Sequence, residues 1–209
     1  MPKKILDLKP REARSHFLKG SSYFNNDLPL YLSFEPLLKN VDAILTGRPF
    51  TEMCHQDKSK WPKNISNVNY QFMTNKDGKL AWRPLEIMHP VIYISLVNYM
   101  TMSKNWKLIG QRFQEFSKGY VHCCSALTIS DDTNSDRATQ INHWWIDFEQ
   151  RSLKASLQFS HLVQTDVSDC YGSIYTHSIA WALHGKDLAK QKQGPQQLLG
   201  NNIDWGCPR

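Results

Sequence analysis

A tight turn between two alternating segments constrains the fold of this chain more than any other feature. Tyr70 and Phe72 alternate with polar residues before the turn, and Trp82 and Leu85 follow it. The turn reads Asn-Lys-Asp-Gly over residues 75–78, and Asp-Gly favours a short hairpin because both residues readily adopt positive φ. The sequence therefore predicts an antiparallel β-hairpin around this turn.

Several helices are expected around the hairpin, because apolar residues recur at helical spacing between proline and glycine boundaries. We expect them over residues 10–19, 36–46, 90–102, 105–118, 136–159 and 176–184. Further strands are expected at 120–129 and 161–167, with polar loops at 51–67 and 131–136. This mixture predicts the α+β fold class.

The composition is that of a globular protein with a core, since 41% of the 209 residues are hydrophobic. The longest largely apolar run, over residues 91–97, is far shorter than the roughly 20 residues of a membrane span. The charged N-terminus predicts no signal peptide. None of the five cysteines is spaced C-x-x-C, so neither a disulfide framework nor a structural zinc site is expected. We expect a cytoplasmic protein with no membrane partner.

Positive charge is concentrated in the first half of the chain. Residues 1–110 contain 16 lysines and arginines against 9 acidic residues, whereas residues 111–209 contain 9 against 10. A basic half can attract a polyanion such as nucleic acid or a nucleotide phosphate. The alternative is a solvated surface with no partner.

Asp166 lies at the end of the strand expected at 161–167. Because a buried charge is costly, we expect a metal ion, a cation or helix amides beside this carboxylate. Magnesium prefers carboxylate oxygens and keeps positions for substrate phosphates. The alternative is that Asp166 caps the following turn, since the Asp-Val-Ser-Asp stretch is rich in turn residues.

Three segments resemble one family. Asp-Val-Ser-Asp-Cys-Tyr-Gly-Ser-Ile over 166–174 resembles the first catalytic motif of reverse transcriptases, and residues 175–179 resemble its extension in the bacterial defence-associated branch, the abortive-infection and unknown-group enzymes. Lys-Asp-Gly-Lys-Leu-Ala-Trp-Arg-Pro-Leu over 76–85 resembles the fingers hairpin of the same superfamily. Residues 9–20 resemble the start of the branch. Together the segments span most of the chain, from residue 9 to residue 179, in the family's order.

The resemblance implies roles for the residues of the first motif. Asp166 would ligate two magnesium ions, with the carbonyl of Val167 as a further ligand. Backbone amides near Asp169 and Cys170 would meet the triphosphate. Tyr171 would be the steric gate that favours deoxynucleotides, although it could instead be a core residue.

The resemblance also implies a phosphate-binding site on the hairpin. Arg83 would pair with phosphate oxygens, and Lys76 or Lys79 would supply a second positive charge. The alternatives are that Arg83 is a surface cation and that Lys76 is a solvated turn residue.

The implied architecture is a helical N-terminal arm over 1–50, a fingers region over 51–130 and the start of an incomplete palm over 131–190. The tail, 191–209, is expected to be poorly ordered. A second acidic motif, Tyr-x-Asp-Asp, does not follow Asp166, and the pair Asp131–Asp132 precedes it. We therefore expect a truncated or frameshifted antiphage reverse transcriptase that is inactive alone.

In the parent enzyme the partners would be an RNA template, a DNA product and deoxynucleoside triphosphates, with Mg²⁺ as cofactor. Two alternatives remain open: a non-catalytic nucleic-acid-binding module, and a module that interacts with a polymerase. An incomplete palm sheet would expose a strand edge, so self-association is a further expectation.

Four residues, His122, Cys123, Cys124 and Cys170, could suggest a metal cluster. Adjacent cysteines on a strand point to opposite faces, so a core residue beside a half-exposed one is the alternative.

His177 and His184 share a helix face and could bind a metal or nucleic acid, or be satisfied structural histidines. Trp144 and Trp145 could stack on bases, but the apolar face of their helix predicts that at least one is a core residue.

Overall fold

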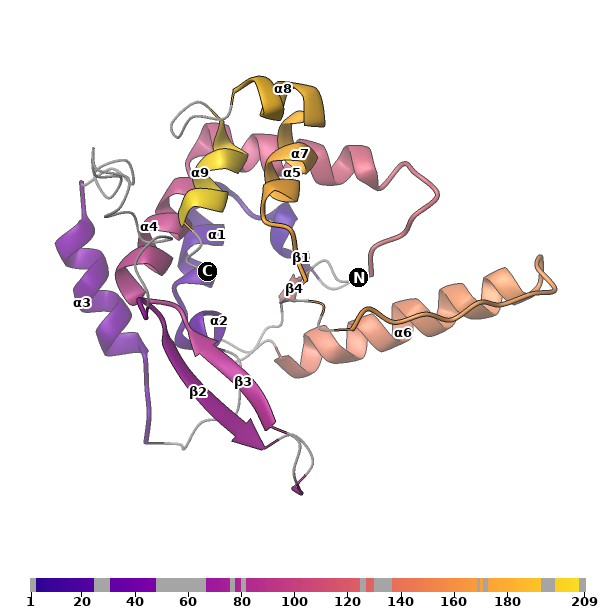
Figure 1. Ribbon diagram of the computed structural model, residues 1–209, viewed down its shortest axis with the longest axis horizontal. Coiled ribbons are helices and arrows are strands. Elements are labelled where there is room, and N and C mark those ends of the chain that lie inside the picture. The colour runs from indigo at the N-terminus through magenta and orange to yellow at the C-terminus, as the bar shows by residue number, and fades with distance from the viewer. Residues whose placement is uncertain are drawn as a thin grey trace.

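The computed structural model describes residues 3–24, 31–47, 67–75, 78–79, 82–124, 127–129, 137–168, 170, 173–192 and 198–206. Helices predominate over two small antiparallel sheets, which confirms the α+β class (Figure 1). The elements are β1 (Lys3–Lys4), a 3₁₀ turn (Ile5–Asp7), α1 (Pro10–Phe17), α2 (Gly20–Tyr23), α3 (Glu35–Leu45), β2 (Tyr70–Asn75), β3 (Trp82–Ile87), α4 (Pro90–Met100), α5 (Ser103–Phe116), β4 (Thr128–Ile129), α6 (Arg137–Ser156), α7 (His177–His184), α8 (Lys186–Gln191) and α9 (Leu199–Gly206).

Helix boundaries follow local chemistry. Helix α1 begins with Pro10, and the backbone N–H of Lys9 donates to the Glu12 carboxylate at 2.9 Å. Helix α3 is followed by Gly47 at φ 80°, and α7 is followed by Gly185 at φ 83°. Both glycines have a positive φ that other residues avoid, so the helices end at them. The predicted ends of α3 and α7 are confirmed.

The predicted hairpin is confirmed. Strands β2 and β3 pair antiparallel, from Tyr70 opposite Ile87 to Asn75 opposite Trp82. Gly78 lies in the turn at φ 76°, and its N–H donates to the side-chain oxygen of Asn75 at 2.8 Å. The side chain of Asn75 thus holds Gly78 beside the end of β2, within the connection that the sequence predicts.

The base of the hairpin is fixed to the N-terminal arm. The Asn69 side chain accepts a hydrogen bond from the His89 N–H at 3.0 Å, immediately before α4. The Tyr23 hydroxyl donates to the carbonyl of Met88, and the ring of Phe24 lies 5.9 Å from that of Phe72. The hairpin therefore projects from a held base (Figure 1).

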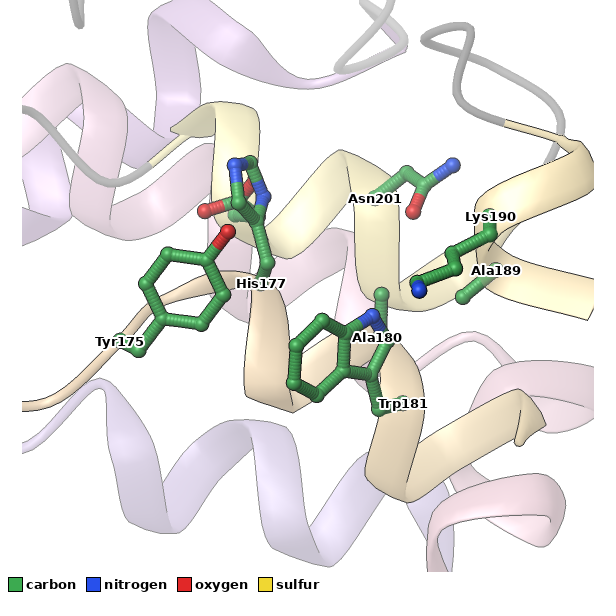
Figure 2. Close-up of a pocket in the computed structure, with 8 residues that line it drawn as sticks. Tyr175, His177, Ala180, Trp181, Ala189, Lys190 and Asn201 are labelled. Carbon is green, nitrogen blue, oxygen red and sulfur yellow. The ribbon is translucent and has the colours of Figure 1, made fainter. Parts of the chain in front are cut away.

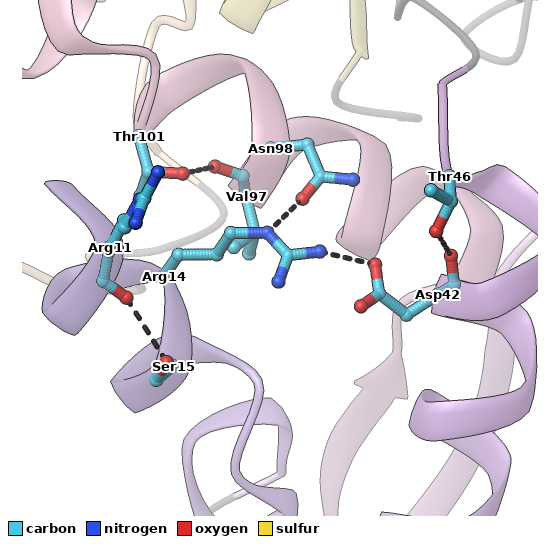
Figure 3. A network of polar contacts seen from close by, with 8 residues as sticks. All are labelled: Arg11, Arg14, Ser15, Asp42, Thr46, Val97, Asn98 and Thr101. Carbon is cyan, nitrogen blue, oxygen red and sulfur yellow. Dashed lines mark hydrogen bonds and ion pairs between the residues drawn. The ribbon is translucent and has the colours of Figure 1, made fainter.

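A polar network joins three helices beside this base (Figure 3). Arg14 of α1 donates from Nε to Asn98 of α4 at 2.7 Å and from Nη2 to Asp42 of α3 at 2.5 Å. Leu38 and Val97, on the two partner helices, are buried. Arg14 thus links the arm to α3 and α4.

Two apolar clusters form the main core. In one, Ile5 and Ala13 of the arm pack with Trp106 of α5, whose indole N–H donates to the Leu8 carbonyl at 2.9 Å. In the other, Leu96 of α4 packs with α9. Burial of these side chains is the main force that holds the helices together.

The expectation that the tail, 191–209, is poorly ordered is wrong for residues 199–206. They form α9, which packs on α7 and α4, and Leu199, Asn202 and Ile203 are buried. The Asn202 amide also donates to the Tyr99 hydroxyl at 2.5 Å. Leu199 and Ile203 lie four residues apart and supply an apolar face within a polar composition. Residues 193–197 and 207–209 lie outside the described residues.

The prediction of a strand at 161–167 is also wrong. This segment is extended but belongs to no sheet, and its side chains are exposed. It runs back along α6 (Figure 1). A strand needs a neighbour for its backbone hydrogen bonds, and no strand in the described part of the chain pairs with it. The strand expected at 120–129 is reduced to β4, which pairs with β1.

Helix α6 is confirmed, but its expected burial is not. None of its residues is buried, and Trp144 and Trp145 are 40% and 68% exposed, so neither is a core residue. Its N-terminal part contacts β4, where Gln140 donates to the Thr128 carbonyl at 3.4 Å. The apolar face over residues 141–153 otherwise stays open. No described helix is long and apolar enough to cross a membrane.

Candidate functional site

Asp166 lies in the exposed segment that returns along α6. Its carboxylate accepts the N–H of the adjacent Val167 at 2.8 Å, and no ion pair joins it to a described cation. The expected buried charge with a compensating partner is therefore wrong. In an exposed position the carboxylate keeps its hydration, so it needs no partner for stability. The described hydrogen bond reaches only Val167, and residue 169 lies outside the described residues, so the capping alternative stays a prediction.

The rest of the first motif surrounds a turn. Val167 is 62% exposed, and Cys170 is exposed as well. The Ser173 hydroxyl donates to the Ser168 carbonyl at 3.2 Å and closes the turn. Asp169 and Tyr171 lie outside the described residues, so their implied roles stay predictions.

The cations of the hairpin lie toward its turn. Arg83 is exposed on β3, opposite Thr74, whose hydroxyl donates to the Arg83 carbonyl at 3.2 Å. Lys79 is exposed in the turn, beside Gly78. Lys76 lies outside the described residues. Two positive side chains therefore share one end of a ribbon whose other end is anchored.

The hydrogen bonds described for Arg83 and Asp166 stay within their own segments. Arg83 bonds Thr74 across the hairpin, and Asp166 bonds the adjacent Val167. Figure 1 shows the hairpin and α6 projecting from the helical body as separate arms. A nucleotide site built from both would need an element that brings them together.

A pocket of about 300 Å³ lies directly after the first motif, between α7, α8 and α9 (Figure 2). His177 Nδ1 is 2.7 Å from a carboxylate oxygen of Asp204, whose side chain is only 6% exposed. Tyr175 and Trp181 line the same pocket, and Lys190 lies across it on α8. A buried carboxylate that orients an imidazole is an arrangement suited to proton transfer. Sequence reasoning missed Asp204 because it lies in the segment that was expected to lack order.

His184 has a structural role. Its Nε2 accepts the backbone N–H of Gly200 at 3.2 Å, which ties the end of α7 to α9. Burial, with a smaller contribution from the positive charge of Arg112, lowers its pKa below the usual value. The structural alternative is therefore confirmed for this histidine.

A second polar cluster joins the segment after α5 to the middle of α6. His122 Nε2 lies 3.0 Å from Asp147 Oδ2, and Arg151 Nε donates to Asp147 Oδ1 at 2.9 Å. The Cys124 thiol also hydrogen-bonds the Asp147 carboxylate. The sequence indicated His122 and Cys124 as candidate metal ligands but did not indicate Asp147. The available signal was that Asp147 and Arg151 lie four residues apart, on one helix face.

These contacts change the acidity of the cluster. Burial raises the pKa of Asp147, but hydrogen bonds from His122, Cys124 and Arg151 together lower it more, to about 2. Burial and the neighbouring Asp147 carboxylate raise the pKa of the Cys124 thiol. The cluster thus holds an ionised carboxylate beside a protonated thiol.

No protein-family model matches this chain, and no curated protein shows significant similarity to it.

Proposed function

We propose that this chain is the N-terminal part of an RNA-directed DNA polymerase, a reverse transcriptase of the antiphage defence type. The observation that carries the proposal is the β2–β3 hairpin, which presents Arg83 and Lys79 near its turn, upstream of the Asp166 motif. Order along the chain and the resemblance of both segments support the same family.

The hairpin suits a phosphate-binding role. Its base is held by the Asn69–His89 hydrogen bond and by Tyr23, so the ribbon is positioned before a ligand arrives. The guanidinium of Arg83 can pair with two phosphate oxygens, while a lysine ammonium adds a point charge. Triphosphates and the backbones of RNA template and DNA product offer such oxygens.

Asp166 is the proposed metal ligand. Its exposed carboxylate is available to Mg²⁺, and the carbonyl of Val167 is the proposed second donor. Nucleotidyl transfer by two metal ions needs further carboxylates, which the 209 residues do not supply after Asp166 in a Tyr-x-Asp-Asp motif. On this proposal the chain binds nucleic acid and contributes half of a metal site.

A second candidate function, a polymerase-interacting module, is favoured by α6. Trp145, Ile146 and Phe148 are each more than half exposed, and so are Leu162 and Val163 on the returning segment. Large apolar side chains exposed in this number are typical of an interaction surface. The proposed occupant is the remainder of a polymerase palm, whose strands would pair with residues 161–167.

The second candidate is tested by mixing the chain with a polypeptide that carries the second acidic motif and measuring sedimentation. Trp145→Ser should weaken the complex, whereas Gln150→Ser, an exposed polar change on the same helix, should not. Equal complexes from both variants would rule out the α6 face. A chain that forms only dimers of itself would favour self-association instead.

The polymerase proposal is tested by fluorescence anisotropy with a labelled DNA primer annealed to an RNA template. Binding should weaken as salt rises, because neutralised phosphates release counterions. Arg83→Ala and Lys79→Ala should each weaken binding and reduce the slope of log affinity against log salt by about one.

The matched control is Lys39→Ala, which removes the same charge from the exposed face of α3. Its affinity and salt slope should equal those of the unmodified chain. If Arg83→Ala and Lys39→Ala behave alike, the hairpin is not the phosphate-binding element and the proposal fails.

A further inference from the structure

The His122–Cys124–Asp147 cluster stands apart from the proposed nucleotide site. Its residues come from two elements, the segment that follows α5 and helix α6. We propose that these three side chains form a binding site for a zinc ion. The inference does not rest on the polymerase proposal.

The three donor atoms are already gathered. One nitrogen of His122, the sulfur of Cys124 and one carboxylate oxygen of Asp147 all lie within 4.8 Å of one another. A tetrahedral zinc ion with bonds of about 2.0–2.3 Å keeps its ligand atoms roughly 3.3–3.7 Å apart. The observed spacing therefore needs only small side-chain movements to accept an ion.

The donor types select the metal class. Imidazole and thiolate favour zinc over magnesium or calcium, which prefer oxygen ligands alone. On binding, zinc would replace the hydrogen bonds that now link His122 and Cys124 to Asp147. The thiol proton would leave to solvent, so that Cys124 binds as a thiolate and His122 as a neutral ring.

Arg151 supplies the support that such a site requires. Its Nε donates to Asp147 Oδ1, while Oδ2 faces His122. The carboxylate is thereby oriented with one oxygen held by the guanidinium and the other left for an ion. Outer hydrogen bonds of this type fix metal ligands in position. Arg151 is a positioning residue and not a ligand.

The fourth coordination position would be open. His122 and Cys124 line a cavity of about 660 Å³, together with Arg151, Phe159 and His161. Three protein ligands and an accessible fourth position are typical of zinc sites that keep a water molecule. A zinc ion there would also fasten the segment after α5 to α6, an otherwise exposed helix.

The test is titration of the reduced, chelator-treated chain with Co²⁺, followed by displacement with Zn²⁺. Cobalt bound by Cys124 should give a thiolate-to-metal charge-transfer band and intense tetrahedral visible bands, and one equivalent of Zn²⁺ should abolish both. Cys124→Ser should lose the charge-transfer band, and Asp147→Asn should lose the tetrahedral bands.

Matched controls are Cys123→Ser and Cys170→Ser, which should keep the complete spectrum. Arg151→Gln leaves all three ligands in place and should weaken affinity by about 10- to 100-fold without changing the band positions. Far-ultraviolet circular dichroism establishes that each variant is folded.

Two results would overturn the assignment. One is a chain that binds no stoichiometric Co²⁺. The other is a charge-transfer band that survives in folded Cys124→Ser, which would place the metal on another cysteine.

Discussion

Arg14 Nη2 lies 2.5 Å from Asp42 Oδ1, and this ion pair joins the N-terminal arm to helix α3 (Figure 3). The same guanidinium donates to Asn98 of α4. Arg14→Ala removes both bonds and leaves Asp42 without its cation. We expect the free energy of unfolding to fall by about 1–2 kcal/mol, because the pair is only partly buried.

Urea unfolding measures this loss. The control is Arg11→Ala, an exposed change one turn earlier on α1, which should alter stability by less than about 0.5 kcal/mol. Equal losses in the two variants would show that the network does not hold the arm.

Two half-buried tyrosines, Tyr23 and Tyr93, should make stability fall at alkaline pH. Burial raises the pKa of Tyr23 from 10.0 to about 12. Burial, and then the charge of Tyr23, raise the pKa of Tyr93 as well. In the unfolded chain these phenols ionise near pH 10. Their contribution to the free energy of unfolding is therefore complete below pH 10 and is lost as the pH rises toward 12.

The free energy of unfolding should therefore decline more steeply between pH 10 and 12 in the unmodified chain than in Tyr23→Phe. Urea titrations at stepped pH give both slopes. Identical slopes would mean that Tyr23 ionises as readily in the folded chain as in the unfolded one.

Gly200 marks the close approach of α9 to α7. A Cβ added there would lie 3.0 Å from both the Cβ and the backbone nitrogen of Ala180. Gly200→Ala should destabilise the chain by about 1–3 kcal/mol, because packed helices would have to separate.

Gly110 is the matched control, since a Cβ there meets nothing within 4 Å inside α5. Gly110→Ala should be neutral or stabilising by up to about 1 kcal/mol. Thermal unfolding of both variants tests the packing. If Gly200→Ala is as stable as Gly110→Ala, α9 does not pack on α7 as described.

The isolated chain should not extend a primer. One carboxylate cannot hold two divalent ions in the geometry that nucleotidyl transfer needs. Incorporation of labelled deoxynucleotide should equal that of a mock preparation, with either Mg²⁺ or Mn²⁺. Incorporation that disappears in Asp166→Ala would show that the 209 residues hold a complete metal site.

Local signals account for the part of the fold that the sequence predicts. The hairpin has Gly78 at positive φ in its connection, and the ends of α3 and α7 depend on Gly47 and Gly185 at positive φ. Each is decided within a few residues, so the sequence is sufficient.

The missed features depend on distant partners. Residues 161–167 have strand character, but strand formation needs a neighbouring strand. Helix α9 needs the surface of α4 and α7 to bury Leu199 and Ile203. Asp147 meets His122 only because the chain after α5 returns to α6. Arg83 and Lys79 are exposed on the predicted hairpin, whereas the surroundings of Asp166 differ from those expected.

Asp166 is proposed to supply one part of a polymerase metal site. The most direct test is the nucleotide sequence that follows codon 209 in the source DNA, read in all three frames. The expected result is an encoded Tyr-x-Asp-Asp motif followed by a thumb-like helical segment. If no frame encodes a second acidic motif, the assignment of Asp166 to a polymerase site is contradicted.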